Sequence, residues 1–120
     1  MKSIRTLAVA FLIIFLSATI SAQTKMQSGS WAVNQTISGY SLDKNSGERI
    51  LTIEIQFDKS FSTKPKIFLS LTQIDASKES NLRYNIEAIS VSRDGFTIKV
   101  GTWSDSKVFS LSGYWLAYED

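Results

Sequence analysis

Apolar and polar residues alternate with a period of two along several segments of this chain. In residues 51–57 every odd position is apolar and every even position is polar, and Phe96, Ile98 and Val100 repeat the pattern further on. Neighbouring side chains of a β-strand point to opposite faces, so this period predicts half-buried strands of an antiparallel sheet. We therefore expect the odd positions of residues 51–57 to face a core.

Two further segments are predicted to be strands on less regular patterns. Residues 66–74 are apolar on both faces at their start, which is typical of a central strand. In residues 82–88 the even positions are apolar, so Leu82 and Tyr84 are predicted to face inward. The same alternation predicts that Arg83 points away from the core.

The ordered part of the chain is expected to begin at residues 30–33, after a polar leader, and to end with a strand over residues 107–118. This last strand is predicted to carry Val108, Ser110, Ser112, Tyr114 and Leu116 on one face, and Phe109, Leu111, Trp115 and Ala117 on the other. Turn-forming residues separate the segments, and no helical period follows residue 22. The predicted fold class is all-β, with one antiparallel β-sandwich domain.

The first 22 residues have the layout of a secretory signal peptide. Lys2 and Arg5 precede an apolar stretch over residues 7–16, and small and polar residues follow up to Ala22. The alternative is a retained membrane anchor, but the apolar stretch is shorter than the roughly 20 residues that span a bilayer. We expect a signal peptide over residues 1–22, a domain over residues 23–120, no membrane span in the mature form, and a secreted or extracellular protein, with a periplasm or cell surface as alternative locations.

Charge and composition narrow the function classes. Cleavage after Ala22 removes two of the 13 basic residues and none of the 11 acidic ones, which leaves 11 of each and a net charge of zero. No basic stripe remains, which argues against a nucleic-acid partner. The chain has no cysteine, so disulfides cannot supplement the core of this small domain.

Motifs of catalysis are missing from the sequence. The chain contains no histidine, no glycine-rich phosphate loop, no Gly-x-Ser-x-Gly and no clustered pair of carboxylates. Histidine is the usual base of a catalytic triad and the commonest zinc ligand. We expect a protein that is not an enzyme and that uses neither a metal nor a cofactor.

Short pieces in a fixed order resemble the H-type lectin domain family, the domain type of snail albumen-gland agglutinins and of the carboxy-terminal part of discoidins. They are Gln27-Ser28-Gly29, residues 70–75, Asn81-Leu82-Arg83, Ser90-Val91-Ser92, Gly95-Phe96, Thr102-Trp103, Lys107-Val108-Phe109-Ser110 and Trp115. The resemblance implies a six-stranded antiparallel β-sandwich that forms a homotrimer. It also implies binding of terminal N-acetylgalactosamine or galactose on glycans, in shallow sites near the boundaries between neighbouring protomers.

The resemblance assigns Arg83 and Trp103 to the sugar site. The guanidinium group can donate to two neighbouring hydroxyls, and the indole offers a flat apolar face to the C–H groups of a sugar. On strand alternation alone, pairing of Arg83 with a carboxylate such as Glu87 or Glu54 is favoured over sugar binding. For Trp103, packing in the core or between protomers explains the residue as well as sugar binding does.

The chain departs from the family pattern at three places. Ser104 stands where many members carry a histidine, and Phe109 stands where an aromatic hydroxyl is usual. The family's loop aspartate falls on Ser46 by direct counting, and on Asp43 or Asn45 after a small shift. Ordinary turn chemistry is the alternative for each of these three loop residues.

Two function hypotheses remain open on the sequence. One is a secreted lectin for galactose-type sugars, made multivalent by trimer formation. The other is an oligomeric structural or adhesive module that keeps the sandwich, binds protein partners and has lost sugar binding. The departures at Ser104 and Phe109 are the reason to keep the second hypothesis.

Overall fold

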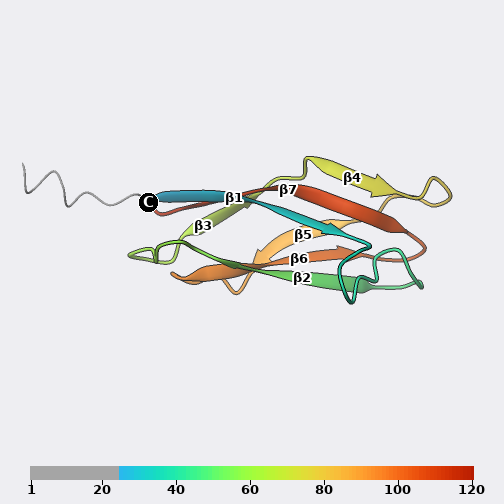
Figure 1. The fold of residues 1–120 in the computed structure, drawn as a ribbon, viewed down its shortest axis with the longest axis horizontal. Helices are drawn as coiled ribbons and strands as arrows, with labels where there is room; N and C mark the ends of the chain where they lie inside the picture. The colour runs from blue at the N-terminus through green and yellow to red at the C-terminus, as the bar shows by residue number, and fades with distance from the viewer. Residues whose placement is uncertain (1–24) are drawn as a thin grey trace, which may run out of the picture.

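The protein is described by a computed structural model over residues 25–120. The predicted signal peptide lies outside these described residues. Seven strands follow one another along the chain (Figure 1): β1 (Met26–Asn34), β2 (Arg49–Gln56), β3 (Lys66–Leu69), β4 (Gln73–Ala76), β5 (Asn85–Ile89), β6 (Gly95–Thr102) and β7 (Val108–Tyr118). Within residues 25–120 no helix is long and apolar enough to cross a membrane.

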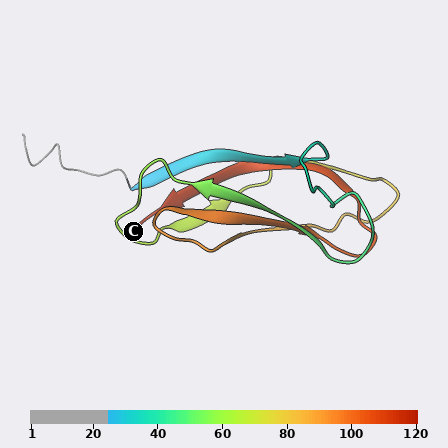
Figure 2. The same ribbon diagram turned by 60° about the horizontal axis from the view of Figure 1, so that its bottom comes forward.

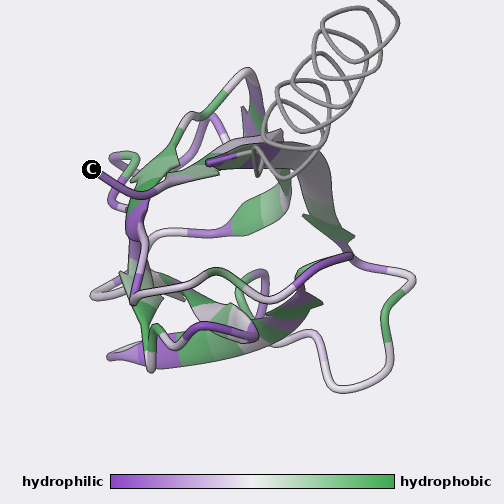
Figure 3. Ribbon diagram, turned by 90° about the vertical axis from the view of Figure 1, so that its left-hand side faces the viewer, coloured by the Kyte–Doolittle hydropathy of each residue, from purple (hydrophilic) through white to green (hydrophobic). Residues whose placement is uncertain are grey.

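The strands form two antiparallel sheets, which appear as two layers when the molecule is viewed along its long axis (Figure 3). Sheet A has the order β1-β7-β3, with β4 also paired to β7, and sheet B has the order β2-β6-β5. The eleven-residue strand β7 is long enough to pair with β3 and then with β4 along the same side. The predicted all-β antiparallel sandwich is confirmed.

The core lies between the sheets and uses the faces that the period of two predicts. Phe96, Ile98 and Val100 of β6 are at most 3% exposed, and the odd positions of β2 pack against the same cluster. Trp115 and Leu111 of β7 enter it from the other sheet. Burial of these apolar side chains is the main stabilising contribution in a domain without disulfides.

The prediction of one central strand over residues 66–74 is wrong. The segment is divided into β3 and β4, and both lie at the edge of sheet A because, among residues 25–120, β7 is the one strand that pairs with them. Residues 70–72 between them still bond to β7, with the Ser70 amide donating to Tyr114 O at 2.9 Å. The apolar residue that suggested a central strand, Phe68, is 61% exposed and stacks on Tyr118 outside the core. This division gives seven strands where six were expected.

Three other expectations also need correction. β1 begins at Met26 and not at residue 30, because it pairs residue by residue with β7 from the Met26–Tyr118 pair onward. Leu82 and Tyr84 are 45% and 40% exposed, since β5 begins only at Asn85. In β7 a register shift opposite β4 leaves Phe109 between two paired residues, so Val108 is fully buried while Phe109 is half-buried.

The path of the chain gives the sandwich two different ends (Figure 2). Residues 35–48, 77–84 and 103–107 connect the strands at one end, which we call the loop end. Residues 57–65 and 90–94 connect them at the other, which we call the aromatic end. The start of β1 and the end of β7 also lie at the aromatic end, because Met26 pairs with Tyr118.

Candidate functional site

The three connections of the loop end are joined to one another by backbone hydrogen bonds. The Gly47 amide donates to Ser104 O at 2.9 Å, and the Ser77 amide donates to Lys107 O at the same distance. The Val108 amide donates to Leu42 O, also at 2.9 Å. Residues far apart in the sequence therefore form one surface at this end of the sandwich (Figure 1).

Arg49 is the buried centre of this surface. It is 6% exposed, and its guanidinium group donates to backbone oxygens only. The acceptors are Leu42 O (3.5 Å), Lys44 O (2.9 Å), Gly47 O (3.0 Å), Ser104 O (3.0 Å) and Ser106 O (2.8 Å). No carboxylate among residues 25–120 pairs with it. One side chain thus fixes residues 42–47 relative to residues 104–106.

The sequence patterns did not predict that Arg49 holds the loops together, although one signal for it exists. Arg49 has an odd residue number, like the inward-facing positions of residues 51–57, so its side chain lies on the buried face at the start of β2. A charged residue on the inward face of a strand is almost never buried without partners. Here the partners are the carbonyls of two loops, which no local sequence pattern reveals.

Arg83 lies just before β5 and extends over the turn that follows β6. Its Nη1 donates to Asp105 Oδ1 at 2.7 Å and to the buried Ser106 Oγ at 3.2 Å, and its side chain is 27% exposed. The predicted partners Glu87 and Glu54 instead contact Lys99 and Thr97. In the described part of the chain, the Nε and Nη2 atoms of Arg83 have no hydrogen-bond partner.

Trp103 directly follows β6 and is 45% exposed, so it is not a core residue. Its ring lines a hollow of about 130 Å³ together with Glu48, Asn85 and Lys99. Arg83 does not line this hollow, although its backbone oxygen accepts a hydrogen bond from the neighbouring Thr102 Oγ1. Trp103 and Arg83 therefore belong to the same end of the sandwich but border different parts of its surface.

The turn at Ser104 and the loop over residues 43–46 are placed against each other. Ser104 has a left-handed backbone (φ 58°), and its carbonyl accepts the bonds from Gly47 and Arg49 while its side chain is exposed. Asn45 also has a positive φ of 60°, and its carbonyl accepts a bond from the Lys107 ammonium group. The side chains of Asn45 and Ser46 are exposed.

Asp43 is half-buried beneath this loop. Its Oδ2 accepts a hydrogen bond from Gln35 Nε2 at 2.8 Å, whereas its Oδ1 is buried with no partner among the described residues. Burial, with a smaller contribution from the charge of Asp43, raises the pKa of Tyr40 to about 12. The Tyr40 hydroxyl donates to Val108 O at 2.6 Å and so ties the loop to β7.

Phe109 lies apart from the other predicted site residues. It belongs to sheet A, at the register shift between β4 and β7, and is half-buried. No interaction of its ring with Arg83 or Trp103 is present in the described structure. The structure thus connects Arg83 to Ser104 through Ser106 and Arg49. Asp43, Asn45 and Ser46 lie in the adjoining loop, Trp103 lies beside it, and Phe109 lies in sheet A. Residues 25–120 contain no group of three or more acidic, histidine or cysteine side chains that could hold a metal ion.

Known proteins share both the sequence and the fold of this domain. Residues 52–118 match the H-type lectin domain. The chain belongs to the H-type lectin domain family. The match includes Arg83, Trp103, Ser104 and Phe109, whereas Arg49 and the loop over residues 43–46 precede it. The resemblance found in the sequence is therefore confirmed, and the domain is of a carbohydrate-binding lectin type.

Individual relatives agree with this family. One of the discoidin-1 polypeptides of Dictyostelium discoideum is 31% identical over 77 residues, which cover 63% of this chain and 30% of the relative. A protein of Fuscovulum blasticum named ATP synthase subunits region ORF 7 is 28% identical over 71 residues, which cover 59% of this chain and 62% of that protein. The chain thus matches less than a third of the length of the discoidin-1 polypeptide.

The solved structure of recombinant discoidin II of Dictyostelium discoideum has a similar fold. Its TM-score is 0.69 at 20% sequence identity, over 79% of this chain and 37% of that chain. At this identity the similarity shows the fold alone, and it agrees with the two-sheet architecture described above.

Proposed function

We propose that this protein is a secreted, non-enzymatic lectin that binds terminal galactose or N-acetylgalactosamine at the loop end. Membership in a lectin domain family supports carbohydrate recognition. The observation that carries the proposal is the hydrogen bonding of the Arg83 guanidinium group. Its Nη1 is held by Asp105 and Ser106, while Nε and Nη2 stay without partners among the described residues. An oriented guanidinium with two free donors fits two neighbouring hydroxyls of a sugar.

The neighbouring side chains supply the other contacts that a neutral sugar needs. Trp103 exposes 45% of its surface and offers an apolar ring for the C–H groups of the sugar. Ser104, Asn45 and Ser46 place exposed hydroxyl and amide groups on the same end of the sandwich. In this proposal Asp43 positions the loop through its bond with Gln35, because its unpartnered Oδ1 is buried, and Phe109 contributes only apolar surface.

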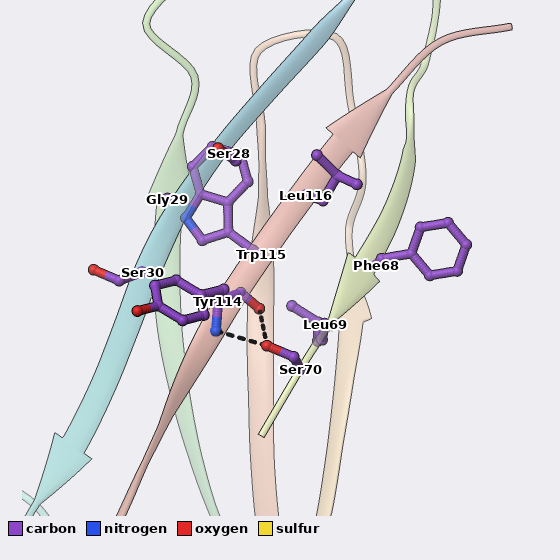
Figure 4. A pocket seen from close by; sticks show the side chains of 9 residues that line it. All are labelled: Ser28, Gly29, Ser30, Phe68, Leu69, Ser70, Tyr114, Trp115 and Leu116. Atoms are coloured by element: carbon purple, nitrogen blue, oxygen red, sulfur yellow. Dashed lines mark hydrogen bonds between the residues drawn. The ribbon is translucent and has the colours of Figure 1, made fainter. Parts of the chain in front are cut away.

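We further propose that the protein forms homotrimers through the outer face of sheet A. This face exposes Phe68 and Tyr114 by 61% and 62% and has a hollow of about 450 Å³ without a charged lining residue. Figure 4 shows these side chains, with the Ser70 hydroxyl bound to the backbone of Tyr114. Contiguous exposed apolar surface marks interaction sites. Trp115 also lines this hollow, although it is only 8% exposed and packs in the core.

The outer face of sheet B has a different character. Glu54 and Gln56 are exposed on β2, and Lys99 forms an ion pair with Glu87 at 3.5 Å. Charged residues are depleted at the centres of protein interfaces, so the contrast favours sheet A as the face between protomers. Several shallow sites on one trimer raise avidity by roughly 10²- to 10⁴-fold without any new contact.

An oligomeric structural or adhesive module is the second candidate function. The hollow on the outer face of sheet A, which has no charged lining residue, favours it equally, because protein partners and further copies of the chain require the same kind of surface. The two functions differ in one property. The second predicts oligomers in light scattering that bind no saccharide.

A glycan array probed with the purified protein tests the proposed function. We expect binding to glycans with terminal galactose or N-acetylgalactosamine, and a loss of about 10- to 100-fold in affinity for Arg83→Ala, since a charge-assisted hydrogen bond contributes roughly 1.5 to 3 kcal/mol. Arg93→Ala is the matched control. Arg93 is an exposed arginine at the aromatic end whose Nε donates to Phe61 O at 2.8 Å, so this variant should bind as the unaltered protein does. Equal binding by both variants, or no saccharide signal at all, would refute the proposal.

A further inference from the structure

The positive charge of Arg83 is matched by a carboxylate within the candidate site itself. Asp105 Oδ1 lies 2.7 Å from Arg83 Nη1, and the Asp105 side chain is 68% exposed. The two charges therefore stand side by side at the surface, where a ligand meets both of them. Asp105 lies in the connection between β6 and β7.

The side chains of Arg83 and Asp105 together offer a ligand both hydrogen-bond donors and a hydrogen-bond acceptor. Arg83 has Nε and Nη2 without partners, and Asp105 Oδ2 accepts no hydrogen bond from any residue of the described chain. A sugar hydroxyl can accept from the guanidinium and donate to the carboxylate at the same time. A sulfate or carboxylate on a sugar can only accept, so it would compete with Asp105 for the guanidinium and be repelled by it.

Among the basic side chains of the loop end, Arg83 is the one that is paired with Asp105, while Lys44 and Lys78 are exposed on two other connections. The guanidinium of Arg49 is buried and bound to carbonyl oxygens. The ammonium group of Lys107 is bound to Asn45 O. Within residues 25–120, Arg83 is the one basic side chain that bonds to the Asp105 carboxylate.

We propose that Asp105 is a specificity-determining residue that makes the site select neutral sugars over sugars carrying a sulfate or carboxylate group. The inference rests on the proposed function and adds to it the class of ligand that the site rejects. Like-charge juxtaposition is an efficient way to suppress binding of a wrong partner, because it leaves the favourable contacts to the right partner in place.

The test compares the unaltered protein with Asp105→Asn, which removes the charge and keeps the size and one hydrogen-bonding oxygen. The probes are methyl galactoside and its 3-O-sulfate, each titrated by calorimetry. We expect the unaltered protein to prefer the neutral probe, and we expect Asp105→Asn to shift the ratio of the two affinities by about tenfold or more toward the sulfated probe. Asp105→Ser, which also removes the charge, should act in the same direction.

Asp94→Asn is the matched control, since Asp94 is an exposed aspartate at the aromatic end whose Oδ1 accepts a bond from Ser60 Oγ. It should leave the ratio unchanged. An unchanged ratio in both Asp105 variants, with galactoside binding intact, would overturn the inference and leave the proposed function standing. Absence of galactoside binding by the unaltered protein would overturn the proposed function, and the inference with it.

Discussion

The two ends of the sandwich are held together by different kinds of interaction. At the aromatic end Phe57 contacts Phe61, Phe96 and Trp115, with ring centroids 4.9 to 5.8 Å apart. At the loop end Tyr40 and Leu42 are also buried, but a buried guanidinium, that of Arg49, lies beside them and binds the carbonyls of two loops. The aromatic end thus relies on contacts between rings, whereas the loop end adds directional hydrogen bonds from a buried charge to its apolar burial.

The difference matches what each end is required to do. Aromatic packing is stabilising but tolerates small shifts of the rings, because area burial has little directional character. Hydrogen bonds from a planar guanidinium fix positions and angles. A recognition surface needs fixed positions, whereas the opposite end mainly needs stability. We therefore expect substitutions at the aromatic end to act on folding, and substitutions at the loop end to act on both folding and recognition.

The largest effect on stability is expected for Phe57→Ala. Phe57 is 6% exposed and lies at the centre of the aromatic contacts. Its truncation should lower the free energy of unfolding by about 3 to 5 kcal/mol in urea denaturation. The folded fraction should keep its affinity for galactosides, because no loop-end contact is changed. A loss of galactoside affinity as large as the loss of stability would contradict the proposed difference between the two ends. The control variant Phe57→Leu should lose clearly less stability than Phe57→Ala.

A somewhat smaller loss of stability, joined to a loss of recognition, is expected for Arg49→Ala. The substitution leaves several loop carbonyls without their donor, and a hydrogen bond to a charged group contributes about 1.5 to 3 kcal/mol. We expect a decrease of about 2 to 4 kcal/mol in the free energy of unfolding, because water can replace part of the lost donors. Calorimetric titration should also show weaker galactoside binding by the folded protein.

The variant Arg49→Lys separates the effect of the charge from the effect of the guanidinium geometry. Lysine keeps the charge but not the planar fork, so it cannot reach carbonyls of both loops in the same geometry. It should recover only part of the stability and little of the binding. Full recovery of binding by lysine would mean that charge, and not the geometry of the fork, organises the loop end.

The smallest effect is expected for Tyr40→Phe, which removes one hydrogen bond from the loop end. Loss of the bond to Val108 O should lower stability by about 1 kcal/mol near neutral pH. Burial raises the pKa of Tyr40 to about 12, against about 10 in an unfolded chain.

The pH dependence of this small effect has a definite sign. Between the two pKa values the unfolded chain releases the tyrosine proton before the folded protein does, so the stability contributed by Tyr40 falls as the pH rises from about 10 toward about 12. Urea denaturation at pH about 8 and about 11 should therefore show a smaller difference between the unaltered protein and Tyr40→Phe at the higher pH. A difference that grows with pH would contradict the assignment.

The sequence predicts the elements whose burial follows a local period. The inward faces of residues 51–57 and of β6 are correct, because alternation alone decides which side of a half-buried strand meets the core. The expectation for residues 66–74 is wrong because Phe68, an apolar residue of the kind that is usually buried, is exposed. Phe109 was predicted to share a face with Leu111, but a register shift opposite β4 leaves Val108 buried and Phe109 half-buried.

The candidate site was predicted only in part, for a related reason. Arg83 and Trp103 emerged from short motifs with a family resemblance. The roles of Arg49 and Asp105 depend on bonds across 55 and 22 positions of the chain, to Ser104 and to Arg83. Contacts of that range have no local signature, so they require the folded structure.

The pairing of Met26 with Tyr118 has a practical consequence for how the domain can be displayed. Both described ends of the chain lie at the opposite extremity from Arg83 and Trp103 (Figure 2). A label, a linker or a solid support joined at either end therefore leads away from the residues proposed to meet a glycan. Immobilised through its terminus, the domain would present its loops outward as an oriented capture surface.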